Sequence, residues 1–228
     1  MLVDSNLKAR ISGVTHLFDR TLLQLAGDHL PRPHGNCYWL IPGRLIAGEY
    51  PRTVDAVASR QKLAAILATG VRQFIDLTEV TEPLENYATL LQSVAADSGC
   101  EVRHDRFPIE DLSIPQPEDM RAILRMIGDA HCADRPVYLH CWGGIGRTGT
   151  VVGCLLVECG FTPEEAIALI ARKWMSMDKR NRRPQSPETK DQFAYIHDWS
   201  RLRGMTPLFG GSGEINTAQF AQPKNCTN

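Results

Sequence analysis

The stretch VYLHCWGGIGRTGTVVGCLLVECG, Val137–Gly160, decides the fold of this chain. Its first four residues, Val137–His140, predict a buried strand, and its last thirteen are apolar almost all round, which predicts a helix buried in the middle of a domain. Between them, glycines at positions 143, 144 and 146 permit positive φ and the close approach of an anion. The backbone N–H groups of such a turn, together with the N-terminus of the next helix, predict a cradle for a phosphate-like dianion.

Strands and helices alternate along the chain before this stretch. Short β-rich runs predict strands, and apolar residues at helical spacing that end at glycines predict helices. The expected strands flank the turn Pro42-Gly43 and cover Val71–Leu77 and 101–107, and the expected helices cover Val54–Ala68, Leu84–Asp97 and Glu118–Ala130. This alternation implies βαβ crossovers, so we expect the α/β class, with a central, mainly parallel sheet flanked by helices.

Two capping signals predict the helices that follow the glycine-rich turn. TPEE, at 162–165, is a capping box with proline at the first helical position. SPET, at 186–189, predicts a last helix with Ser186 as its N-cap and Gly204 as its stop. We therefore expect one domain over 36–204, a partly helical extension over 1–35 and a flexible tail over 205–228.

Composition excludes several classes of function. The chain has 228 residues, a formal net charge of −1 and no apolar run near the ~18 residues that span a bilayer, so we expect neither a nucleic-acid partner nor membrane insertion. The start does not resemble a secretory signal, and the seven cysteines are irregularly spaced without a CxxC pair. We expect a reducing, cytoplasmic setting, no metal and no cofactor.

Three side chains around the turn carry the predicted chemistry. Cys141 lies at the mouth of the positive cradle, where it is expected to be largely thiolate and therefore a nucleophile. Arg147, six residues later, can make bidentate bonds to two phosphoryl oxygens. Thr148 places a hydroxyl near the sulfur, where it could stabilise the thiolate as it leaves.

HCWGGIGRTG, His140–Gly149, resembles the H-C-x5-R-[ST]-G signature of cysteine-dependent protein tyrosine and dual-specificity phosphatases, and the resemblance extends over about residues 36–200. It is greatest to compact dual-specificity-like members, including relatives of the cyclin-dependent-kinase-associated phosphatase. It implies a phosphatase-type P-loop, a phosphocysteine intermediate on Cys141 and a phosphorylated protein or peptide as substrate. The loop amides that would bind the phosphate are those of Trp142, Gly143, Gly144, Ile145 and Gly146.

The resemblance also implies an aspartic acid on an upstream loop, which protonates the leaving oxygen and then activates water. Asp111 in FPIEDLSIPQP, thirty residues before Cys141, is the candidate, with Glu110 and Asp105 as its competitors. His140 is expected to support the loop by hydrogen bonds rather than to transfer protons. Gln192 matches only the second of two glutamines found in tyrosine-specific members, so we expect water positioning to rest on Asp111 and the backbone.

The sequence leaves several alternatives open. The substrate could be a phosphoinositide or another non-protein phosphate, although WGGIG contains no lysine to meet extra phosphates. The chain could also be a phosphoprotein-binding module with weak catalysis, although the intact cysteine, arginine and aspartate argue against it. The basic run Lys179–Arg183 could be a solvated face or could border the pocket. Four cysteines, Cys100, Cys132, Cys154 and Cys159, are alternative redox partners for Cys141.

Overall fold

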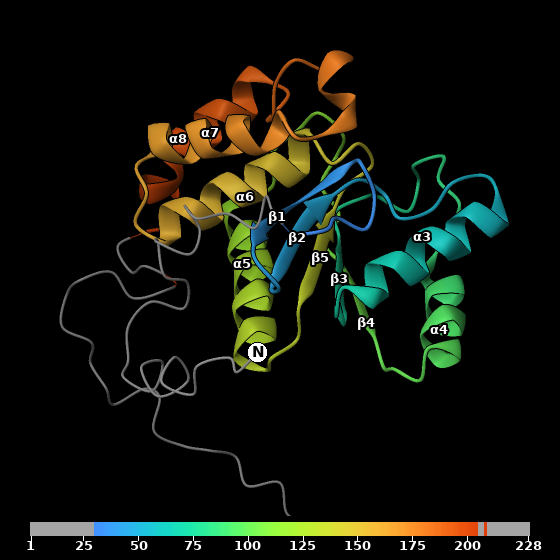
Figure 1. The fold of residues 1–228 in the computed structure, drawn as a ribbon. Coiled ribbons are helices and arrows are strands. Elements are labelled where there is room, and N and C mark those ends of the chain that lie inside the picture. Colours follow the sequence, from blue (N-terminus) through green and yellow to red (C-terminus); the bar gives the residue numbers. More distant parts are fainter. Residues whose placement is uncertain (1–29, 205–207, 209–228) are drawn as a thin grey trace, which may run out of the picture.

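A five-stranded sheet forms the centre of the protein, seen in a computed structural model that describes residues 30–204 and 208 (Figure 1). The strand order is β1-β2-β5-β3-β4. β1 pairs with β2 antiparallel as a hairpin, whereas β2, β5, β3 and β4 are all parallel. The predicted α/β class with a mainly parallel sheet is therefore confirmed. The strands are β1 (Cys37–Ile41), β2 (Leu45–Gly48), β3 (Gln73–Asp76), β4 (Arg103–Arg106) and β5 (Val137–His140).

Helices cover both faces of the sheet, with α3 and α4 on one side and α5 to α8 on the other (Figure 1). They are α3 (Ala56–Ala68), α4 (Ala88–Asp97), α5 (Pro117–Cys132), α6 (Gly146–Glu158), α7 (Pro163–Trp174) and α8 (Lys190–Leu202), with a 3-10 helix, η1, at Asp178–Asn181. Every residue of α6 is buried, because this helix packs against α5, α7, α8 and the sheet. The prediction of a helix buried in the middle of the domain is confirmed.

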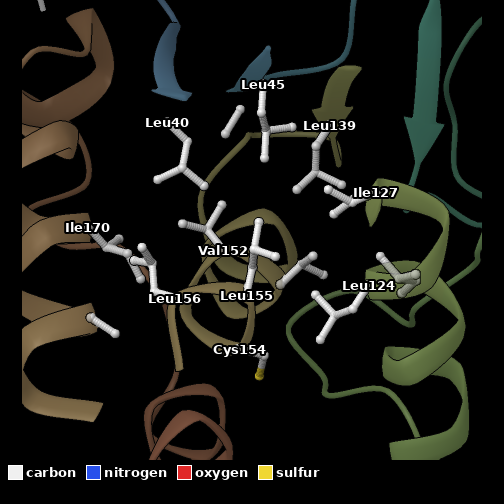
Figure 2. Packing of buried hydrophobic residues seen from close by; sticks show 14 of the residues in the cluster. Leu40, Leu45, Leu124, Ile127, Leu139, Val152, Cys154, Leu155, Leu156 and Ile170 are labelled. Carbon is white, nitrogen blue, oxygen red and sulfur yellow. The ribbon is translucent and has the colours of Figure 1, made fainter. Parts of the chain in front are cut away.

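The two layers of helices enclose two hydrophobic cores. The core under α3 and α4 is rich in aromatic residues, among them Phe74, Tyr87 and Tyr138. The larger core surrounds α6, and Figure 2 shows side chains of α6 packed between the sheet, α5 and α7. Its labelled members are Leu40, Leu45, Leu124, Ile127, Leu139, Val152, Cys154, Leu155, Leu156 and Ile170.

The helix boundaries differ from the predictions by more than two residues at two places. α4 begins at Ala88 rather than at Leu84. α8 begins at Lys190, and its N-cap is Thr189 in a capping box with Gln192, so the prediction that Ser186 caps this helix is wrong. The hydroxyl of Ser186 instead donates to the carbonyl of Ile145, which turns the segment 186–189 toward the glycine-rich loop.

Other predicted features are confirmed or lie outside the described residues. Thr162 and Glu165 form the expected capping box of α7, and Gly204 follows the last helix with a φ of +83°. The predicted helix before residue 30 lies outside the described residues, and so does the predicted tail apart from Leu208. The proposed boundaries at 35 and 204 stay predictions.

Candidate active site

The glycine-rich loop connects the carboxyl end of β5 to the start of α6. Cys141 is the first residue of this loop, and only 3% of its surface is exposed. The backbone N–H of Gly144 donates to Cys141 Sγ over 3.3 Å. The sulfur therefore lies inside the turn, close to the free N–H groups at the N-terminus of α6.

The glycines of the loop serve different purposes. Only Gly144 has a positive φ, of +73°, and a Cβ on this residue would lie 2.5 Å from the carbonyl carbon of Gly48. A Cβ on Gly146 would lie 2.8 Å from Oε1 of Gln192. Gly144 is thus required for its backbone conformation and for the close packing of the loop on the end of β2, while Gly146 is required for space alone.

Arg147 is 1% exposed and is held from several sides. Its Nη1 donates to the carbonyls of Leu77 and Ile109 and to Glu82, and its Nη2 donates to Glu82 Oε2 over 3.1 Å. Burial disfavours the charged guanidinium, but the neighbouring Glu82, Cys141 and Asp111 outweigh it and raise the pKa of Arg147 above its ordinary value. The arginine is therefore a fixed cation beside Cys141.

Two buried donors at the site have no partner among the described residues: Nε of Arg147 and Oγ1 of Thr148. A buried N–H without a partner is costly, so such a group is usually met by a bound ligand or by water. Both residues belong to the first turn of α6, next to Cys141. The pair fits a bound oxyanion that would accept from Arg147 and lie near Thr148.

The structure brings Asp111 to the loop, as the sequence predicted. Its Oδ1 lies 2.8 Å from Nη2 of Arg147, while 54% of its side chain stays exposed. The competing acids are placed differently: Asp105 accepts from Gln73 within the sheet, and Glu110 is exposed. Asp111 is thus the acid of this segment that reaches the glycine-rich loop.

Sequence reasoning missed Glu82, which makes a two-pronged contact with the guanidinium of Arg147. Glu82 lies in the loop after β3, and its Oε1 also accepts from the N–H of Glu79. A signal was present, because β3 and β5 are parallel neighbours and their following loops meet at the same edge of the sheet. The loop contains several acids, however, and the sequence does not choose among them.

His140 is fully buried beneath Cys141. Its Nε2 lies 2.7 Å from the hydroxyl of Tyr87, and its Nδ1 lies 3.2 Å from the carbonyl of Cys141. A carbonyl can only accept, so Nδ1 carries the proton and Nε2 accepts from Tyr87. Burial lowers the pKa of His140 to about 4, against an opposing effect of Asp76. The hydrogen bonds thus hold a neutral histidine against the backbone of Cys141, and its supporting role stays a prediction.

The side chain of Asp76, at the end of β3, is the shared hydrogen-bond partner of several groups below the loop. Its side chain is fully buried and accepts from Thr78, His104 and Arg106. Burial alone would raise the pKa of Asp76, but His140, His104 and Thr78 lower it well below its ordinary value. The ends of β3 and β4 are therefore tied together under the loop by one ionised carboxylate.

The basic run at 179–183 borders the loop through its first residue. Lys179 Nζ donates to the carbonyl of Gly143 over 3.4 Å and pairs with Glu49, which also accepts from Lys62 over 2.6 Å. The two lysines lower the pKa of Glu49 although burial opposes them. Trp142 stands apart from these contacts with 43% of its surface exposed, and its carbonyl accepts from the N–H of Tyr50.

Gln192 links the last helix to the segment that carries Asp111. Its Nε2 donates to the carbonyl of Ser113 over 3.0 Å, and its Oε1 accepts from the N–H groups of Glu188 and Thr189. Both polar ends are occupied, and the side chain lies against Gly146. In this arrangement Gln192 holds the acid-bearing loop against the P-loop.

The described residues contain no cluster of side chains able to hold a metal ion. None of the helices in the described part of the chain reaches the length and hydropathy of a membrane-spanning segment. Burial raises the pKa of the Cys154 thiol well above its ordinary value and that of Cys159 to about 12, whereas Cys132 is exposed. A redox partner for Cys141 stays a prediction.

Comparison with known proteins relates this chain to one family of enzymes. The family model PTP-SAK, described as a Swiss Army Knife protein, DSP-PTPase phosphatase domain, matches residues 34–196. The chain is 26% identical over 137 residues to "Putative tyrosine phosphatase 067L" of Invertebrate iridescent virus 3, in a match that covers 58% of this chain and spans about half, 50%, of that relative.

Two solved structures are similar in fold. Tk-PTP in its active form is 26% identical with a TM-score of 0.53, and the match covers 69% of this chain and 92% of that one. Kinase associated phosphatase (KAP), with its catalytic cysteine replaced by serine, is 20% identical with a TM-score of 0.56, over 71% of this chain and 89% of that one. Because the identity to KAP is only 20%, that similarity shows the fold alone.

Proposed function

Since the chain belongs to the DSP-PTPase phosphatase domain family, it is a cysteine-based dual-specificity-type phosphatase, and we propose that it hydrolyses phosphotyrosine, and phosphoserine or phosphothreonine, in a protein substrate. The observation that carries the proposal is the buried, unpartnered Nε of Arg147 beside Cys141. A phosphate monoester dianion supplies the acceptor that this donor lacks. The cysteines in the part of the chain that the structure describes are free thiols, which fits the cytoplasm, where we place its activity.

In the proposed first step, Cys141 Sγ attacks phosphorus in line with the ester oxygen. The S–P bond forms as the P–O bond breaks, and Arg147 with the loop N–H groups stabilises the charge on the equatorial oxygens. Asp111 gives its proton to the leaving oxygen. Arg147 Nη2 lies 2.8 Å from Asp111 Oδ1 in the structure, which supports Asp111 as the acid that reaches the loop.

In the proposed second step, Asp111 removes a proton from water. The water oxygen attacks phosphorus, the S–P bond breaks and Cys141 leaves as a thiolate near the hydroxyl of Thr148. His140 takes no part in proton transfer, because both its ring nitrogens are occupied by Tyr87 and the Cys141 carbonyl. Inorganic phosphate is the product.

The surroundings of the loop favour a protein substrate. Three apolar side chains, Leu112, Ile114 and Trp142, are exposed on the acid-bearing segment and on the P-loop. Such a rim can receive an aromatic phosphorylated side chain and its apolar neighbours. Lys179 already pairs with Glu49, which reduces its availability for a second phosphate of a phosphoinositide.

The decisive experiment measures hydrolysis of an aryl phosphate by the Cys141→Ser and Asp111→Asn variants. We expect Cys141→Ser to abolish turnover, because an alcohol at this position is a much weaker nucleophile. We expect Asp111→Asn to reduce kcat about 10²–10⁴-fold. Glu110→Gln, the neighbouring exposed acid, is the matched control and keeps wild-type kinetics. Turnover by Cys141→Ser at the wild-type rate refutes the mechanism.

A substrate panel separates the remaining candidates. Matched phosphotyrosine and phosphothreonine peptides, a phosphoinositide and an aryl phosphate are compared by kcat/KM. The proposal requires the highest value on a phosphopeptide. A higher value on the phosphoinositide assigns the enzyme to lipid phosphates, and tight phosphopeptide binding without hydrolysis by the wild-type protein assigns it to a binding module.

A further inference from the structure

A cleft that is separate from the proposed active site lies away from the glycine-rich loop. It has a volume of about 620 Å³, within the range of about 300–1,000 Å³ that is usual for small-molecule sites. Arg72, Arg103 and Arg135 line it, together with one acid, Glu101. None of the residues that line the cleft takes part in the proposed mechanism.

The three arginines come together because of the sheet register. Residues 73, 103 and 137 are paired partners at the amino ends of the adjacent parallel strands β4, β3 and β5 (Figure 1). Arg103 is the first residue of β4, Arg72 directly precedes β3, and Arg135 lies two residues before β5. Two further hydrogen bonds, from the Arg103 N–H to the Arg72 carbonyl and from the Arg72 N–H to the Pro136 carbonyl, continue the sheet to this edge. The strand register thus places three arginines around one cleft.

The positive charge of this cleft is not neutralised. Within the part of the chain that the structure describes, none of the three arginines forms an ion pair with a carboxylate. Nη1 of Arg72 donates only to the carbonyls of Leu67 and Val71. Nε of Arg135 is buried and has no partner among the described residues. With Glu101 as the acid of the lining, the local charge is about +2.

We propose that this cleft binds a small organic phosphate through Arg72, Arg103 and Arg135. A phosphate monoester carries a charge of about −1.5 to −2 at neutral pH, which matches the uncompensated charge of the lining. Guanidinium forks bind phosphate oxygens in pairs, and such a ligand supplies the acceptor that Arg135 lacks. Ala96 and Val102 complete the wall with apolar surface for the organic part of the ligand.

The cleft and the active site are separate. The arginines lie at the amino ends of β3, β4 and β5, whereas Cys141 follows the carboxyl end of β5. Each of these strands is four residues long, so the two edges of the sheet lie about 13 Å apart. The proposal does not rest on the proposed function, and binding at the cleft is measurable in a protein that cannot turn over.

The experiment titrates the ¹⁵N-labelled Cys141→Ser protein with inorganic phosphate and, separately, with adenosine monophosphate. Backbone amide shifts distinguish the cleft, at residues 72, 101–103 and 135, from the P-loop at 142–147. We expect both ligands to shift the cleft amides, with adenosine monophosphate binding there several-fold more tightly. Equal or weaker binding of adenosine monophosphate would assign the cleft to inorganic phosphate and overturn the organic part of the proposal.

Variants test the arginines within the same protein. The double substitution Arg103→Gln with Arg135→Gln should weaken binding at the cleft about tenfold or more, and leave binding at the P-loop amides unchanged. Arg125→Gln, an exposed arginine on α5 outside the cleft lining, is the control and should bind as before. Shifts confined to the P-loop, or equal affinity of the double variant and the control, would refute the site. The amide spectrum of each variant shows whether it is folded.

Discussion

At the scale of single residues, Arg147 depends on Glu82 for its orientation. Glu82 meets the guanidinium with both carboxylate oxygens, in a side chain that is only 7% exposed. A bidentate contact of this kind fixes the plane of the fork, and with it the direction of the unpartnered Nε. Glu82 is therefore a positioning residue for phosphate binding.

We expect Glu82→Gln to lower kcat/KM for an aryl phosphate about ten- to a hundredfold, because one charged hydrogen-bond pair to Arg147 is lost. The loss should appear in KM and in the affinity for vanadate as well as in kcat, and the midpoint of thermal unfolding should fall too, because the buried Arg147 cation loses its charged partner. Glu85→Gln is the matched control, since Glu85 is exposed in the same loop and pairs with Arg52. Equal kinetics of the two variants would show that Arg147 is oriented without Glu82.

At the scale of elements, the turn from β5 into α6 depends on Gly144. A side chain there must adopt a φ of +73° and also enter space within 2.5 Å of the Gly48 carbonyl group. We expect Gly144→Ala to reduce kcat/KM about a hundredfold or more, because the loop must move away from β2 and displace the catalytic groups. Activity and unfolding in urea are both measured.

Gly43→Ala provides a control that separates strain from displacement. Gly43 has a similar φ, of +68°, in the β1–β2 turn, and a Cβ there meets nothing within 4 Å. This variant should lose about 1 kcal/mol of unfolding free energy and retain full activity. If Gly144→Ala behaves in the same way, the close approach to Gly48 is irrelevant to catalysis.

The same elements show how far the sequence predicts this protein. The strand–turn–helix at 137–158 is predictable because its hydrophobic pattern, its glycines and its reactive residues all agree locally. Asp111 is predictable because it lies on a loop at a characteristic distance from Cys141. Glu82 is not, since its contact with Arg147 depends on which strands are neighbours in the sheet.

The predicted start of α8 is wrong for a related reason. SPET has the local signature of a helix start, but tertiary contacts override it. Ser186 uses its hydroxyl on the Ile145 carbonyl, and TKDQ, three residues later, provides a second capping box at Thr189. The helix begins where Gln192 can both close that box and reach the carbonyl of Ser113.

At the scale of the whole molecule, a buried and a partly buried histidine, both neutral, make stability depend on pH. Burial lowers the pKa of His140 to about 4 and, with help from Lys62, that of His34 to about 3. The hydrogen bonds agree with the neutral form of His34, because its Nδ1 accepts from the N–H of Asn36 and its Nε2 faces Tyr138. Protonation of His34 would remove the acceptor for Asn36.

The direction of this pH dependence follows from the protons that each histidine binds in the folded and in the unfolded state. An unfolded histidine takes up its proton near pH 6.5, whereas the folded one does so only near its lowered pKa, so the unfolded state binds more protons between these values. Unfolding free energy is therefore highest above pH 6.5 and falls as the pH is lowered toward 4. His140 alone should account for about 2 kcal/mol between pH 7 and pH 5, and His34 acts in the same direction. Asp76 does not contribute in this window, because its lowered pKa makes its own stabilisation disappear only below its ordinary value of 3.8.

Urea unfolding of the full chain at pH 7 and pH 5 measures this difference directly. His34→Gln removes one of the histidines whose pKa is lowered in the fold, so its loss of stability between the two pH values should be smaller than that of the wild type by about 2 kcal/mol or less. His197→Gln is the control, because His197 is about half exposed and pairs with Glu164 at the surface, and its pH dependence should match the wild type. A wild-type protein as stable at pH 5 as at pH 7 would mean that burial does not lower the pKa of these histidines in the fold.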